Sequence, residues 1–217
     1  MNTNVAQRLT LALAAMALGS VAGTLPSESW LNAPQAPPVE RVRVETLRPI
    51  PALPAPPQDK RVEEVFAQLM ARQARTGLTP EELSQLAEAV VETADLYAFD
   101  CELVLAVMHV ESRFDAFAVS PKHALGLMQI LPSTGEWMAG KLGIRWEGPQ
   151  TLFDPVTNLT IGVAYLRELW DRYGHLETAL AAYNWGPTAI DRRLARGASL
   201  PSIYAGLVMD ALQSKSS

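Results

Sequence analysis

From residue 59 onward, apolar side chains recur every three or four positions, the spacing that places them on one face of an α-helix. The stretch T-P-E-E at residues 79–82 predicts a helix start, with Thr79 as the N-cap, proline in the first turn and Glu82 completing a capping box. Runs with the two-residue alternation of a β-strand are absent from the sequence. The folded region is therefore predicted to be all-α.

Two aspartates mark further helix starts. Asp100 is expected to cap a helix that ends near Glu111, and Asp154, which is followed by proline, caps a second one. Three shorter helices, separated by glycine and proline, are expected at residues 176–183, 188–194 and 202–212.

The first 58 residues have a different composition. A run without charge, L-T-L-A-L-A-A-M-A-L-G-S-V-A-G, ends in small residues near position 23, which is typical of an export signal. If it is not cleaved, this run would act as an inner-membrane tether. The stretches A-P-Q-A-P-P and R-P-I-P-A-L-P-A-P-P then hold half of the chain's 16 prolines. Such a segment favours extended conformations and buries little, so residues 24–58 are predicted to be a linker.

Composition argues against several kinds of partner and site. The 18 basic and 23 acidic residues give a net charge of −5, with no long basic run, which argues against a nucleic-acid partner. The single cysteine excludes an intrachain disulfide. The three histidines stand apart from one another, and no phosphate-binding glycine loop is present. We therefore expect no metal ion and no cofactor.

Glu111 is an unusual residue for its position. Its helical face is otherwise apolar, because the residues three, four, seven and eight positions earlier are Met108, Val107, Val104 and Leu103. Burial raises the pKa of a carboxyl group, and the negative end of the helix dipole acts in the same direction. A carboxyl that stays protonated near neutral pH can serve as a general acid.

Two later stretches carry polar groups among apolar ones. G-L-M-Q-I-L-P-S-T, from residue 126, places one amide, Gln129, in an apolar run. A-A-Y-N-W-G-P, from residue 181, places a phenol, an amide and an indole side by side. Aromatic faces and amides are the groups that sugar binding requires.

Taken together, E-S-R-F-D-A-F-A-V-S (residues 111–120), these two stretches and F-D-P-V-T-N-L-T-I-G-V-A-Y-L resemble the catalytic domain of soluble-type lytic transglycosylases. The resemblance covers roughly residues 96–210. It implies a goose-type, lysozyme-like helical fold and cleavage of the glycan strands of peptidoglycan. The implied organisation is a signal segment or anchor (1–23), the linker (24–58), a helical extension (59–95), the catalytic domain (96–210) and a tail (211–217).

The resemblance also implies roles for individual residues. Glu111 matches the single catalytic acid and base, and Tyr183 matches a tyrosine that contacts it. The residues that match substrate-binding positions are Ser120, Met128, Gln129, Tyr183 and Asn184. Two residues depart from the family pattern: His123 stands where glycine is usual, so that the loop backbone could differ, and Trp185 stands where a small residue is usual.

The expected mechanism depends on whether a second carboxylate reaches the site. Asp115 and Asp154 are the candidates, and ordinary glycosidases need such a pair. With Glu111 alone, the resemblance implies intramolecular closure of a 1,6-anhydro ring. The alternatives are a muramidase that hydrolyses the same bond and a non-catalytic peptidoglycan-binding scaffold. The export signal places the protein in the periplasm, and the linker and extension would suit tethering to a secretion or conjugation machine.

Overall fold

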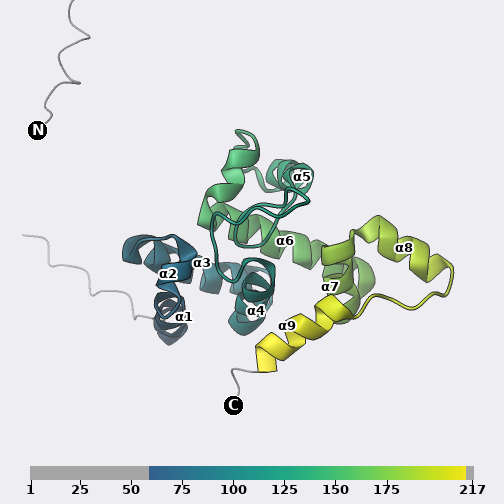
Figure 1. Ribbon diagram of the computed structural model, residues 1–217, viewed down its shortest axis with the longest axis horizontal. Helices are drawn as coiled ribbons and strands as arrows, with labels where there is room; N and C mark the ends of the chain where they lie inside the picture. The colour runs from purple at the N-terminus through teal and green to yellow at the C-terminus, as the bar shows by residue number, and fades with distance from the viewer. Residues whose placement is uncertain (1–58, 214–217) are drawn as a thin grey trace, which may run out of the picture. The chain divides into compact units, whose positions relative to one another are not determined.

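The computed structural model describes residues 59–213, and over this range the chain forms helices joined by turns and loops (Figure 1). Within residues 59–213, β-type pairing is limited to two isolated β-bridges between residues 119 and 130. The prediction of an all-α fold is confirmed. The predicted signal segment (1–23), the linker (24–58) and residues 214–217 of the tail lie outside the described residues.

The helical elements follow one another with short connections. They are α1 (Lys60–Met70), α2 (Gln73–Thr76), α3 (Pro80–Leu96), α4 (Cys101–Ser112), α5 (Pro132–Leu142), the 3₁₀ helix η2 (Pro149–Phe153), α6 (Pro155–Tyr173), α7 (Leu176–Trp185), α8 (Pro187–Ala195) and α9 (Ile203–Gln213).

The predicted helix starts are confirmed. Thr79 and Glu82 form the expected capping box at the start of α3. The side chain of Asp100 caps α4, and that of Asp154 accepts a hydrogen bond from the backbone N–H of Thr157 at 2.7 Å. Helix α5 was not predicted, because Leu131 precedes it without a side-chain cap and only the proline at its first position marks the start.

Helix α6 packs against α3, α5 and α7, and so it forms the centre of the folded region (Figure 1). Its close contact with the loop before α5 depends on Gly162, where an added Cβ would lie 2.6 Å from the Cβ of Met128. Helix α4 packs against α9, and α9 also contacts α7. The carboxyl end of α4 therefore lies beside the loop before α5, α7 and α9.

No helix within residues 59–213 combines the length and the apolar character that spanning a bilayer requires.

Candidate active site

Glu111 occupies the last turn of α4, where the apolar stripe predicted from the sequence is present. Val107 and Met108 are fully buried, and Glu111 itself is largely buried. Burial raises the pKa of its carboxyl to about 7, and a hydrogen bond from Tyr204, which favours the charged form, opposes that rise. Near neutral pH, Glu111 is therefore divided between its acid and its carboxylate.

Tyr204, from α9, is the direct partner of this carboxyl. Its hydroxyl donates to Oε1 of Glu111 at 2.5 Å across 93 residues of sequence. Burial and the nearby Glu111 charge raise the pKa of Tyr204 well above its usual range, so the hydroxyl keeps its proton at neutral pH. Tyr204 was not predicted from the sequence to be a site residue. The available signal was a tyrosine on the buried face of a short helix, where the hydroxyl needs a partner.

The loop of residues 113–131, between α4 and α5, carries the polar groups that match the resemblance. Ser120 holds a turn in it, since its Oγ accepts the backbone N–H groups of Lys122 at 3.2 Å and Ala124 at 3.0 Å. The hydroxyl proton is the group that Ser120 can still offer to a ligand. His123 adopts a φ of 60°, the left-handed conformation for which glycine is the usual residue. The backbone at this departure from the family pattern therefore takes a glycine-like conformation.

A buried amide from α6 anchors the same loop. Asn158 accepts the N–H of Met128 at 2.8 Å and donates to the carbonyls of Leu125 at 2.9 Å and Leu152 at 2.8 Å. Gly126 passes so close to this amide that an added Cβ would lie 2.4 Å from its nitrogen. Asn158 was not singled out as a functional residue in the sequence, because nothing local distinguishes an amide that organises a distant loop.

Gln129 lies at the end of this anchored segment, also with a left-handed φ of 49°. Its Nε2 donates to the carbonyls of Gly126 at 2.9 Å and Ala118 at 3.2 Å. Both amide hydrogens are therefore used within the loop, and the amide oxygen is the group that Gln129 can present to a ligand.

These residues surround a pocket of about 330 Å³ beside the carboxyl group, called the Glu111 pocket here. It is lined by Glu111, Ser120, Pro121, Lys122, Ala124, Gln129, Leu131, Tyr183 and Asn184. Four of the five predicted substrate-binding residues thus lie together with the predicted catalytic residue. The fifth, Met128, is fully buried and is not among the lining residues.

Tyr183 differs in detail from its expected contact. Its hydroxyl donates to the carbonyl of Met128 at 2.9 Å, and the hydrogen bond to Glu111 comes from Tyr204 instead. Tyr183 is nevertheless close enough for the Glu111 charge to contribute to its raised pKa, after the larger effect of burial.

The two candidate second carboxylates do not line the Glu111 pocket. Asp115 accepts the backbone N–H of Phe117 at 2.9 Å in the turn after α4, and Asp154 is an exposed helix cap. Glu111 is therefore the one carboxyl group among the residues that line this pocket.

The segment around α2 supports the turn that follows Glu111. The Arg72 guanidinium lies over the ring of Phe114, 5.0 Å from its centre, and the carbonyl of Thr76 accepts the N–H of Ala116 at 3.2 Å. Phe114 is buried with a φ of 71°, a strained conformation for a non-glycine residue. These contacts hold that strained turn in place.

Within residues 59–213, no group of three or more His, Cys, Asp and Glu side chains is placed to hold a metal ion.

The family model and the similar curated proteins all name transglycosylases. The family model of the transglycosylase SLT domain matches residues 88–203. A membrane-bound lytic murein transglycosylase C of Sodalis glossinidius is 33% identical over 117 residues, covering 49% of this chain and 33% of the relative. A transglycosylase of Enterobacteria phage PRD1 is 37% identical over 99 residues, covering 46% of this chain and 34% of the relative.

Among solved structures, the 70 kDa soluble lytic transglycosylase of Escherichia coli matches with a TM-score of 0.49 and 22% identity, covering 70% of this chain and 26% of that one. The chain thus spans about a third or less of the length of these relatives. The family model, by contrast, spans more than half of the chain and contains every residue that lines the Glu111 pocket. The chain therefore belongs to the transglycosylase SLT domain family.

Proposed function

We propose that the protein is a peptidoglycan lytic transglycosylase that cleaves the β-1,4 bond between N-acetylmuramic acid and N-acetylglucosamine. The observation that carries this proposal is the geometry of Glu111: one carboxyl, with a pKa of about 7, in a pocket that no second carboxylate lines. Family membership and relatives named as lytic murein transglycosylases support the same activity.

In the first step, Glu111 donates its proton to the glycosidic oxygen as the bond to the muramic acid carbon breaks. The acetamido group of the substrate stabilises the positive charge that develops at this carbon. Glu111 becomes a carboxylate, which the Tyr204 hydroxyl stabilises through its 2.5 Å hydrogen bond.

In the second step, the Glu111 carboxylate takes the proton of the C6 hydroxyl of the same sugar. The freed oxygen attacks the anomeric carbon and closes the 1,6-anhydro ring, so that no water is consumed and Glu111 regains its proton. A pKa of about 7 suits one group that must act first as an acid and then as a base.

The polar groups around Glu111 would hold the sugar rings. Ser120 offers a hydroxyl proton, Gln129 offers an amide oxygen, and Asn184 offers both kinds of group at the exposed edge of the pocket. Sugar hydroxyls can pair with all of them.

A hydrolytic muramidase would need a group that positions water on the opposite side of the sugar. Asp115 was the candidate, but its carboxylate accepts a backbone N–H within its own turn and does not line the pocket. The geometry therefore favours ring closure.

Mass spectrometry of the products released from purified peptidoglycan tests the proposal. The chain should release muropeptides lighter than hydrolytic products by the mass of one water, and Glu111→Gln should abolish the release. Products with free reducing ends would instead establish a muramidase. Binding without any release would establish the scaffold alternative.

We place this activity in the periplasm, because the N-terminal run has the composition of an export signal. A tether to a secretion or conjugation machine through the linker stays a prediction.

A further inference from the structure

Lys122 is the one positively charged residue among those that line the Glu111 pocket. It also lines an adjoining pocket of about 280 Å³, which shares Gln129, Tyr183 and Asn184 with the first. The Lys122 side chain and the Glu111 carboxyl border the same space of about 330 Å³, so a sugar bound at Glu111 is within reach of both. Lys122 was not predicted from the sequence to be a functional residue.

The backbone that carries Lys122 is fixed by a tight turn. The Ser120 Oγ accepts the N–H groups of Lys122 at 3.2 Å and Ala124 at 3.0 Å, and the Ser120 carbonyl accepts that of His123 at 2.9 Å. These bonds hold the base of the lysine beside the pocket. Only its flexible side chain has to become ordered when an anion binds, which lowers the entropic cost of the contact.

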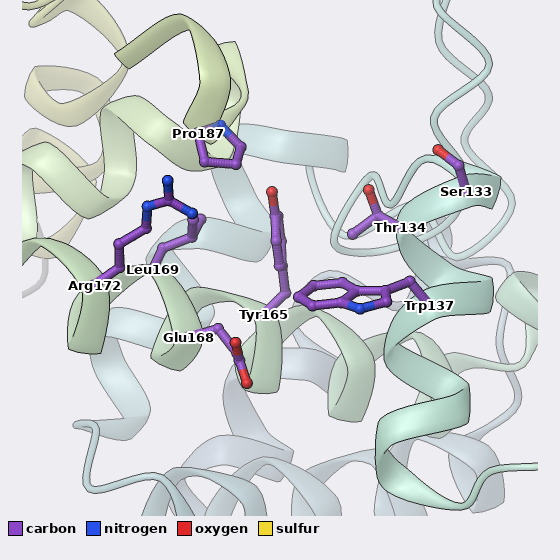
Figure 2. Close-up of a pocket in the computed structure, with 8 residues that line it drawn as sticks. All are labelled: Ser133, Thr134, Trp137, Tyr165, Glu168, Leu169, Arg172 and Pro187. Atoms are coloured by element: carbon purple, nitrogen blue, oxygen red, sulfur yellow. The ribbon is translucent and has the colours of Figure 1, made fainter. Parts of the chain in front are cut away.

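The charge of Lys122 has no counterpart within the folded region. In the part of the chain that the structure describes, no carboxylate forms an ion pair with it, and Lys122 is not among the causes of the raised pKa of Glu111. The neighbouring cavity of about 520 Å³, between α5, α6 and the start of α8, also holds a cation, Arg172 (Figure 2), but that guanidinium pairs with Asp191. Among the described residues of these pockets, Lys122 is therefore the cation left for an anion of the ligand.

The chemistry of a glycan strand limits which anion this can be. Its two sugars differ by the lactyl ether on C3 of N-acetylmuramic acid. Where a stem peptide is attached, the lactyl carbonyl belongs to a neutral amide. Once the peptide has been removed, the same group is a carboxylate, the one anionic group of that sugar. An ammonium beside the bound sugar favours the carboxylate over the amide, because the two form a charge-assisted hydrogen bond.

We propose that Lys122 is a specificity-determining residue that recognises the free lactyl carboxylate, so that the enzyme prefers glycan strands without stem peptides. This inference rests on the proposed function and names the form of the strand that the site takes. The class of reaction that must supply this substrate is hydrolysis of the lactyl amide. That reaction consumes one water, breaks the C–N bond, and leaves a carboxylate on the sugar and an ammonium group on the peptide.

The test compares two ligands by isothermal titration calorimetry. One is a peptide-free tetrasaccharide of alternating N-acetylglucosamine and N-acetylmuramic acid, and the other is the same molecule with its lactyl carboxylates converted to carboxamides. The full chain carries Glu111→Gln, so that neither ligand is cleaved. We expect the carboxylate form to bind about fivefold more tightly, the upper end of the effect of an exposed ion pair. Raising the salt concentration should reduce this preference.

Further variants in the same background locate the effect. Lys122→Gln should abolish the preference for the carboxylate, whereas Lys122→Arg should retain most of it, because it keeps the charge. Lys60→Gln, the same change at an exposed lysine that lines neither pocket, should leave it intact. Equal binding of the two ligands, or a preference that survives Lys122→Gln, overturns the inference.

A second measurement uses the catalytically intact chain on strands with and without their peptides. We expect a higher kcat/KM on peptide-free strands, and Lys122→Gln should lower the ratio of the two values about fivefold. The change should appear mainly in KM, because the carboxylate is present before and during the reaction. A higher kcat/KM on peptide-bearing strands would also overturn the inference. Release of 1,6-anhydro products by the unmodified chain tests the proposed function separately, so either claim can fail while the other stands.

Discussion

Replacing Tyr204 with phenylalanine tests how the acidity of Glu111 is set. The hydroxyl donates to the carboxyl at 2.5 Å and favours its charged form, so its loss should raise the pKa of Glu111 further above 7. The activity of a general acid declines once it loses its proton. We therefore expect the alkaline limb of kcat/KM against pH, near 7 in the unmodified protein, to move to higher pH.

The size of the shift follows from the geometry. A hydrogen bond to a charged group contributes about 1.5–3 kcal/mol. The protonated carboxyl also accepts a hydrogen bond from Tyr204, so only the difference between the two forms counts, roughly half of that value. Since one pKa unit corresponds to about 1.4 kcal/mol, the limb should rise by about half a unit to one unit.

The assay is product release over a pH series, together with a carbon-13 NMR titration of the Glu111 carboxyl. Tyr97→Phe, at a partly buried tyrosine that does not line the Glu111 pocket, should leave the limb in place. An unchanged or lowered limb in Tyr204→Phe, with the fold intact, would refute the assigned role of the hydrogen bond.

Three further predictions concern stability. The pKa of Glu111 is about 7 in the folded chain against 4.5 for an exposed glutamate, so the free energy of unfolding falls as pH rises through that window. Glu111→Gln removes this effect. It should therefore stabilise the protein by up to about 3 kcal/mol at pH 8 and by little at pH 4, as measured by urea unfolding. Gly162→Ala should lower the free energy of unfolding by about 1–3 kcal/mol, because the added Cβ meets Met128. Gly140→Ala, with open space around the added Cβ, should instead stabilise the protein. Equal melting temperatures of the two variants would contradict this contrast. Asn158→Leu should cost about 3–5 kcal/mol, since it leaves buried backbone groups without partners, and a loss below 1 kcal/mol in urea unfolding would argue against its anchoring role.

Local signals in the sequence predicted much of the fold. The capping box at Thr79 and the aspartate caps depend on residues within one turn, so the starts of α3, α4 and α6 could be read directly. Helix α5 lacks a side-chain cap, and it was missed. The buried face that ends in Glu111 was likewise visible as a periodic pattern.

The contacts that complete the site could not be read in this way. Tyr204 reaches Glu111, and Asn158 reaches Met128, only after distant helices have packed together. Contacts between residues so far apart produce no regular spacing that a single sequence could show. The resemblance supplied Ser120, Gln129 and Tyr183 as a group, but it did not reveal that the Tyr183 hydroxyl bonds to a backbone carbonyl.

The contact between Arg72 and Phe114 has a consequence for how the protein can be divided. The family match begins at residue 88, inside α3, whereas Arg72 and Thr76 lie before that point. A fragment that begins at residue 88 would lack the buried side chains of Leu83 and Leu86, and it would leave the turn after Glu111 without the contacts of Arg72 and Thr76. The segment that the family model matches is thus shorter than the segment whose packing supports the site, and chimaeras built from this protein should be joined before α1.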